Sequence, residues 1–148
     1  MKGFVMIGTN DLESSAKFYD ELLEIIGLKA IYSDDKRIGY AHRDEDDVEF
    51  YVTKPANGDV ATCGNGTQIS FLTDSREKVN NFHKVGMDIG GKNEGLPGIR
   101  PSGGDVYYAY VRDLDGNKIC AYTASKIWIK DLKYLPYGSA GFESGRRG

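Results

Sequence analysis

Histidine and cysteine, two side chains that often bind metals or act as nucleophiles, are scarce in this chain of 148 residues. The histidines are His42 and His83, and the cysteines are Cys63 and Cys120. That supply is too small for a zinc finger, a cluster held by four cysteines or a scaffold of several disulfides. The spacing shows no pairing of a nucleophile with a base. Any metal site in this chain would therefore depend on carboxylates.

Two short motifs begin like known binding loops but lack essential residues. Gly86, Gly91 and Lys92 have the spacing of a phosphate-binding loop, but Asn93 stands where serine or threonine is required. Such a loop also needs a preceding strand, and a helix is expected here. The segment 113–116 (Asp-Leu-Asp-Gly) starts like a calcium loop without its later ligands or its terminal glutamate. We interpret this second motif as the turn of a β-hairpin.

The charge and hydropathy of the chain exclude several classes of partner. Lysine and arginine number 19 against 22 aspartates and glutamates, so the formal net charge is −3 and no basic footprint typical of nucleic-acid binding is present. No apolar run approaches the roughly 20 residues that span a bilayer, and no export signal follows Met1. We therefore expect neither nucleic acid nor membrane as a partner, and a cytoplasmic location with reduced thiols.

The first half of the chain predicts a strand, a helix and three further strands. A strand at 3–8 precedes apolar residues that recur every three or four positions, as on one face of a helix. Asn10 is the expected N-cap, with Glu13 three residues later as in a capping box, and Gly27 is the expected end of the helix. Further strands are expected at 29–33, 37–42 and 48–53.

The second half repeats this plan. In the aligned halves, Thr9 falls on Thr73 and Asn10 falls on Asp74, which suggests an internal duplication. The segment 86–104 holds seven glycines and is predicted to be a long loop of the kind that often carries function. The other expected elements are a strand at 67–72, a helix capped by Asp74 and ended by Gly86, and a hairpin of strands at 106–111 and 118–123.

Several of these segments together resemble the vicinal oxygen chelate superfamily. The residues that carry the resemblance follow one another in order over roughly residues 3–124. They are Val5–Glu13, Phe18-Tyr19-Asp20, Asn65-Gly66-Thr67, Gly95–Pro101, Tyr107–Asp113 and Asp115–Ile119. The superfamily includes glyoxalases, bleomycin-resistance proteins and extradiol dioxygenases, so the resemblance indicates a fold without fixing one activity.

The resemblance implies an α+β fold of two paired βαβββ modules whose curved mixed sheets form a cleft. The modules are expected at about 3–54 and 66–124, within a single domain at 1–124, and a C-terminal tail is expected at 125–148. This arrangement agrees with the internal duplication. Clefts of this family are often completed by a second copy, so the resemblance also implies a homodimer.

In metal-using members of the family, the ligands of a divalent ion come from the first and fourth strands of the modules. The matching positions hold Phe4, Glu49, Gln68 and Cys120. Phe4 has no donor atom, Gln68 offers only a weak neutral amide, and a thiol such as Cys120 is mostly protonated near its ordinary pKa of about 8.5. Glu49 is the one ordinary ligand. We therefore expect a cleft without a metal or other cofactor.

Strand alternation predicts which other side chains share this cleft. Glu49 brings Tyr51 to the same face, and Cys120 brings Tyr122. A tyrosine-rich cleft with few charges suits a small planar or amphipathic molecule. Arg100 either clamps a carboxylate or is a solvated loop residue. The expected ligand-binding residues are Phe4, Tyr40, Glu49, Tyr51, Gln68, Arg100, Tyr108 and Cys120.

Two other functions stay open from the sequence. One is a metal-dependent lyase, isomerase or dioxygenase of the glyoxalase type, in which a divalent metal neutralises charge on two vicinal oxygens. Glu49 would then be the catalytic base or a metal ligand, with Gln68 and Cys120 as unconventional partners. The other is an interaction role in which the segment Lys126–Leu135 of the tail docks on another chain.

Overall fold

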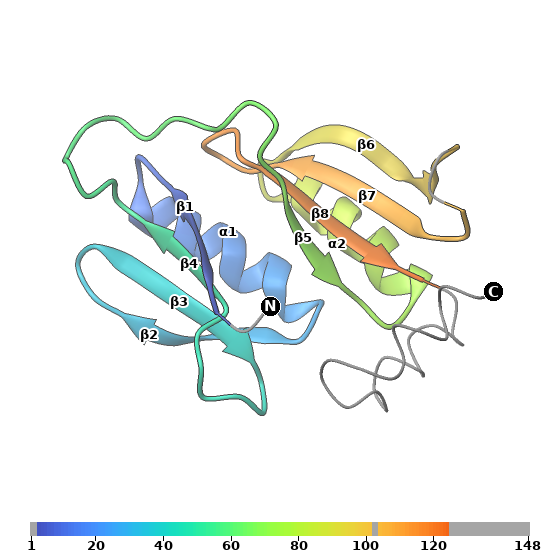
Figure 1. Ribbon diagram of the computed structural model, residues 1–148, viewed down its shortest axis with the longest axis horizontal. Coiled ribbons are helices and arrows are strands. Elements are labelled where there is room, and N and C mark those ends of the chain that lie inside the picture. Colours follow the sequence, from blue (N-terminus) through green and yellow to red (C-terminus); the bar gives the residue numbers. More distant parts are fainter. Residues whose placement is uncertain (1–2, 102–103, 125–148) are drawn as a thin grey trace.

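The computed structural model describes residues 3–101 and 104–124, which form two helices and two mixed four-stranded sheets (Figure 1). The first half contains, in chain order, β1 (Val5–Gly8), α1 (Leu12–Glu24), β2 (Leu28–Ser33), β3 (Arg37–His42) and β4 (Phe50–Thr53). The second half contains β5 (Ile69–Leu72), α2 (Arg76–Asp88), β6 (Lys92–Ile99), β7 (Tyr107–Arg112) and β8 (Lys118–Thr123). The tail predicted at 125–148, with its segment Lys126–Leu135, lies outside the described residues.

The two sheets share one topology. Their strand orders are β1-β4-β3-β2 and β5-β8-β7-β6. In each sheet the first and fourth strands of the module pair in parallel, and the other neighbours pair antiparallel. This topology confirms the predicted α+β fold of two βαβββ modules. Neither described helix is long and apolar enough to cross a membrane.

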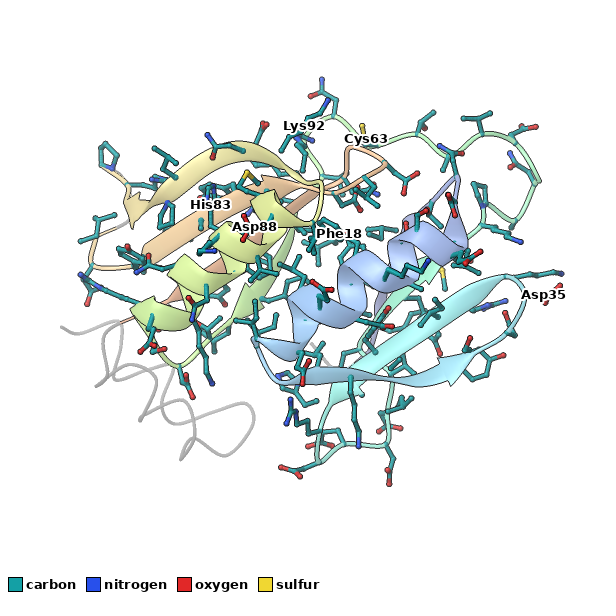
Figure 2. All side chains as sticks on the ribbon, turned by 180° about the vertical axis from the view of Figure 1, so that it is seen from behind. Phe18, Asp35, Cys63, His83, Asp88 and Lys92 are labelled. Carbon is teal, nitrogen blue, oxygen red and sulfur yellow. The ribbon has the colours of Figure 1, made fainter. Side chains whose placement is uncertain are left out.

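Both helices lie on the same side of the sheets, and the core forms there (Figures 1 and 2). Phe50 of β4 and Ile119 of β8 are among the strand residues buried under the helices. Phe18 of α1 is also buried and lies at the junction with α2 (Figure 2). Because side chains alternate along a strand, the intervening residues lie on faces that neither α1 nor α2 covers. We call these the first open face (Phe4, Met6, Tyr32 and Tyr51) and the second open face (Ser70, Tyr108, Tyr110, Cys120 and Tyr122).

Each helix has its N-cap one residue later than predicted. Asp11 caps α1 by accepting a hydrogen bond from a backbone amide of the first turn, where Asn10 was expected. Ser75 caps α2 in the same way, where Asp74 was expected. The amide group of Asn10 is instead engaged with the backbone of Ala61 in the linker between the two halves. A contact distant in sequence therefore decides which of two adjacent capping residues is used.

The predicted helix ends also differ from the structure. The C-cap of α1 is Ile25, and Gly27 turns the chain two residues later with a φ of +86°. α2 continues past Gly86 to Asp88. A Cβ at Gly86 would lie 3.2 Å from both methyl groups of Val111, so this glycine allows α2 to approach β7 closely.

The segment predicted as a glycine-rich loop contains the strand β6. It pairs antiparallel with β7, with register shifts between Asn93 and Gly95 and between Gly95 and Gly98. A Cβ at Gly95 would lie 2.6 Å from Cδ2 of Tyr110, so glycine is required for the ring to lie across the strand. The loop prediction failed because glycines interrupt the apolar alternation by which strands are recognised.

The two halves are joined at the hairpin between β7 and β8. The carboxylate of Asp115 accepts hydrogen bonds from the hydroxyl of Thr9 at 2.6 Å and the hydroxyl of Ser15 at 3.2 Å. It also accepts one from the backbone N of Asn10 at 2.8 Å. The segment 113–116 is therefore the hairpin turn that was predicted, and it also holds the corner between β1 and α1.

Candidate functional site

The second open face carries three stacked tyrosines. The ring centroids of Tyr108 and Tyr110 on β7 are 5.9 Å apart, with an interplanar angle of 9°. Those of Tyr108 and Tyr122 on β8 are also 5.9 Å apart, at 25°. Tyr107 projects to the helix side instead, where its hydroxyl donates to the Asn80 side chain at 2.7 Å. We call Tyr108, Tyr110 and Tyr122 the tyrosine array.

Two cations lie beside the tyrosine array. The guanidinium carbon of Arg100 is 5.1 Å from the ring centroid of Tyr110, and Nζ of Lys118 is 4.9 Å from it. An aromatic face attracts cations through its negative electrostatic potential. Arg100 also donates to the carbonyl of Leu96 at 2.7 Å, which fixes its guanidinium near the ring. Arg100 therefore lies at the predicted site, and its clamping of a carboxylate stays a prediction.

Cys120 is buried on the same face as the tyrosine array. Its register partners are Ser70 on β5 and Tyr110 on β7. Burial raises the pKa of its thiol to about 11, although a hydrogen bond with Ser70 acts in the opposite direction. The thiol is therefore protonated at neutral pH and is a poor nucleophile and a poor metal ligand. Gln68 donates from Nε2 to Oγ of Ser70 at 2.9 Å, so its amide belongs to the same group.

Three aromatic rings meet on the first open face. The ring centroids of Phe4 and Tyr51 are 5.1 Å apart, nearly perpendicular at 83°. Those of Tyr32 and Tyr51 are 6.4 Å apart at 79°. Phe4 and Tyr51 were expected to share a face, whereas Tyr32 was not identified. Nearly all of β2 is exposed, so its sequence gives little sign of which side chains turn toward β4.

Glu49 is paired with His42. Its Oε2 contacts Nδ1 of the imidazole and accepts a hydrogen bond from the backbone N of His42 at 3.3 Å. Both side chains are about half exposed. An imidazole next to a carboxylate can hold or pass a proton. Sequence reasoning considered the two residues separately, although their positions on either side of the turn at 43–47 were a sign that they pair.

Tyr40, one of the predicted ligand-binding residues, does not line either open face. Its side chain is fully buried on the helix side of β3. Its hydroxyl donates to Oδ1 of Asp20 on α1 at 3.0 Å. Burial and the Asp20 carboxylate both raise the pKa of Tyr40. This tyrosine therefore stabilises the packing of α1 on the first sheet.

The remaining histidine and cysteine lie away from the open faces. His83 on α2 is buried, and its Nε2 lies 2.8 Å from Oδ1 of Asn93 on β6 (Figure 2). Cys63 is exposed in the linker, near the hairpin between β7 and β8 (Figure 2). His83 thus links a helix to an edge strand.

The structure places the predicted site residues other than Tyr40 in three groups. Gln68, Arg100, Tyr108 and Cys120 lie with the second open face, Phe4 and Tyr51 lie on the first, and Glu49 lies with His42. Sequence reasoning did not select Lys118, which lies two positions before Cys120 on β8 and therefore on the same face.

The donor atoms at the family metal positions do not fit a divalent ion. Phe4 has none, Cys120 is a neutral thiol, and the Glu49 carboxylate is engaged with His42. Within residues 3–101 and 104–124, no group of three or more His, Cys, Asp or Glu side chains is placed to hold a metal ion.

Comparison with known proteins agrees with the fold. A family model, described as Glyoxalase/Bleomycin resistance protein/Dioxygenase superfamily, matches residues 3–121. The crystal structure of a glyoxalase/bleomycin resistance protein from Albidiferax ferrireducens T118 is 42% identical, with a TM-score of 0.72 over 81% of this chain and 95% of that chain. A search of curated proteins gives no significant match.

More distant structures share the fold at lower identity. A glyoxalase-related enzyme from Fulvimarina pelagi is 21% identical, with a TM-score of 0.63 over 83% of this chain and 87% of that chain. A mutant of glyoxalase I from Zea mays is 24% identical, with a TM-score of 0.61 over 86% of this chain and 47% of that chain. Together, the matched model, the 42% identical structure and the repeated topology show that the chain belongs to the glyoxalase/bleomycin resistance protein/dioxygenase superfamily.

Proposed function

We propose that this chain binds a small planar or amphipathic molecule through the tyrosine array. The observation that supports this function is the near-parallel stacking of three tyrosine rings on the second open face. Aromatic rings attract one another in offset-stacked geometry, so such an array favours planar ligands. Arg100 and Lys118 lie beside the array and favour a ligand that also carries a carboxylate or another anionic group.

Isothermal titration calorimetry with naphthoate, a planar aromatic carboxylate, tests this function. Saturable binding to the parent chain is expected. Tyr110→Leu keeps an apolar side chain but removes the ring, so the affinity should fall about threefold to tenfold, as the loss of one aromatic contact of about 0.5–1.5 kcal/mol implies.

Tyr107→Leu is the matched control. It removes a tyrosine from the same strand, but from the side that faces α2. Its affinity for naphthoate should equal that of the parent chain. An equal loss in both variants, or no saturable binding by the parent chain, would contradict the proposed function.

The alternative function is a metal-dependent lyase, isomerase or dioxygenase, which requires a divalent ion that holds two vicinal oxygens. The absence of a donor on Phe4 and the raised pKa of Cys120 both disfavour it. We therefore expect elemental analysis of protein purified without added metal to find no stoichiometric divalent ion. We also expect the melting temperature to stay constant on addition of nickel, zinc, iron(II) or manganese.

A matched pair of glutamate variants makes this test specific. Glu49→Ala removes the carboxylate at the family ligand position, whereas Glu45→Ala removes one from the exposed turn after β3. A bound ion that is lost in Glu49→Ala and retained in Glu45→Ala would favour the metal-dependent enzyme over the binding protein.

A further inference from the structure

A cavity of about 700 Å³ lies at one end of the first sheet. Phe4 and Glu49 precede β1 and β4, whereas residues at or after the ends of these strands line the cavity, among them Asn10, Thr53 and Lys54. All of the described lining residues come from the first half of the chain and the linker. The cavity is therefore separate from the tyrosine array and from the family metal positions.

Three cationic side chains line this cavity, Lys36, Arg37 and Lys54. Asp59 is the one carboxylate among the described lining residues, and one of its oxygens accepts a hydrogen bond from the Asn57 amide at 3.0 Å. None of the three cations has a carboxylate oxygen within 4.0 Å in the part of the chain that the structure describes. The cavity therefore has a net positive charge that no ion pair neutralises.

Asp34, in the turn between β2 and β3, is a carboxylate that acts on Arg37. It accepts hydrogen bonds from the hydroxyl of Tyr32 at 2.6 Å and from the backbone N of Lys36 and of Arg37 at 2.8 and 2.9 Å. These bonds lower the pKa of Asp34 to about 2, so it is ionised at neutral pH. Its charge weakens the positive potential around Arg37 but does not occupy the donors of the guanidinium.

The guanidinium of Arg37 has a buried donor without an acceptor. Its Nε is buried and has no hydrogen-bond partner among the described residues. A buried donor of this kind costs stability, because it has lost water without gaining another acceptor. Arg37 pairs in register with Thr53 of β4, and both residues line the cavity. Arg37 therefore brings a positive charge to the wall of the cavity.

The walls of the cavity are fixed by hydrogen bonds to the sheet. The backbone N of Lys54 donates to the carbonyl of Lys36 at 2.8 Å, where β4 ends. Farther along the linker, the backbone N of Ala61 donates to the Asn10 side chain at 2.7 Å, and the Asn10 amide donates back to the carbonyl of Ala61 at 3.1 Å. The part of the linker at 54–61, which contributes residues to the cavity wall, is therefore held at both of its ends.

We infer that this cavity binds a small oxyanion, namely the carboxylate or phosphate group of a small molecule. Lysine ammonium groups supply point charges to such a group, and arginine supplies paired donors that match its oxygens. The inference goes beyond the proposed function, because it concerns a different surface and does not depend on the tyrosine array.

Calorimetric titrations with inorganic phosphate and with malonate, at constant ionic strength, test the site. The full chain should bind at least one of the two probes saturably. Arg37→Gln and Lys54→Gln should each weaken that binding about tenfold, because each removes a hydrogen bond between charged groups. Lys54 is exposed, so its variant keeps the fold intact even if the Arg37 variant does not.

Lys17→Gln is the matched control, because it removes the same charge from the exposed side of α1, where Lys17 pairs with Glu13. Binding that is lost in the cavity variants and kept in Lys17→Gln supports the site, and the probe that binds identifies the anionic group. Tyr110→Leu should leave this binding unchanged, which separates the site from the tyrosine array. Failure of both probes to bind, or an equal loss in Lys17→Gln, overturns the inference.

Discussion

Tyr19 and Tyr32 each donate a hydrogen bond of 2.6 Å to an aspartate oxygen, but their surroundings differ. Tyr19 is fully buried and bonds Asp113, whereas Tyr32 is 46% exposed and bonds Asp34. Burial raises the pKa of Tyr19 well above its ordinary value, and the charge of Asp113 acts in the same direction. The Tyr19 hydroxyl is therefore protonated, and available as a donor, at neutral pH.

Replacement of Tyr19 by phenylalanine should lower the free energy of unfolding by about 1–3 kcal/mol, because Asp113 loses a buried donor. Asp113 keeps its hydrogen bonds from the side chain and backbone of Asn117, which limits the loss. Tyr32→Phe removes a bond of the same length at the surface and should leave the urea midpoint unchanged. Urea denaturation followed by circular dichroism measures both. Equal shifts in the two variants would show that burial does not set the strength of these bonds.

Alternation along strands predicted part of the site at this scale. It grouped Cys120 with Tyr122, which do lie on the same face, although burial alone does not show this because Ile119, Cys120 and Ala121 are all buried. It gave no orientation for Tyr40, and the burial of β3 does not alternate there because Ile38 to Ala41 are all buried. The pair of His42 with Glu49 follows from the antiparallel pairing of β3 with β4, the strands on either side of the turn at 43–47.

At the scale of elements, both helices could be predicted from the spacing of their apolar residues. The N-caps could not be fixed to the residue, because Asn10 and Asp11 are both good capping residues. The contact of Asn10 with Ala61, 51 positions away, leaves Asp11 to cap the helix. The sequence around Asn10 alone cannot predict that contact.

The strand β6 could not be predicted, because its glycines are required for close contacts with neighbouring residues and not for strand formation. Gly95 is small so that the ring of Tyr110 on β7 can cross it, and a Cβ there would also lie 3.0 Å from Nη2 of Arg100. The same residues give the strand two register shifts and remove its apolar alternation. The glycines of this segment therefore make room for the tyrosine array and lower the strand propensity of β6.

At the scale of the whole molecule, both open faces expose large apolar side chains. Phe4 on the first open face is 56% exposed. Leu72, which lies two positions after Ser70 on β5 and therefore on the second open face, is 40% exposed. Apolar side chains gathered on an uncovered sheet face are typical of a protein interface. We propose that the protein is a homodimer in which a second copy of this chain contacts these exposed apolar side chains.

Sedimentation equilibrium tests the homodimer. The parent chain should have about twice the mass of one chain, and Phe4→Glu and Leu72→Glu should shift it toward monomer, because each would bury an unpaired charge. Leu114→Glu is the control, since Leu114 is 43% exposed but lies on the hairpin turn between β7 and β8. A monomeric parent chain, or the same shift in the Leu114 variant, would contradict the homodimer.

The hairpin contact at Asp115 makes the two repeated halves structurally different from each other. Thr9 and Thr73 follow the first strand of their respective modules, but Thr9 donates to Asp115 of the other half. The hydroxyl of Thr73 stays within its own half and donates to the carbonyl of Tyr122 at 3.3 Å. This difference breaks the approximate twofold symmetry of the repeat. The halves share one topology, yet only the first half is tied through its threonine to the hairpin of the other half in the part of the chain that the structure describes.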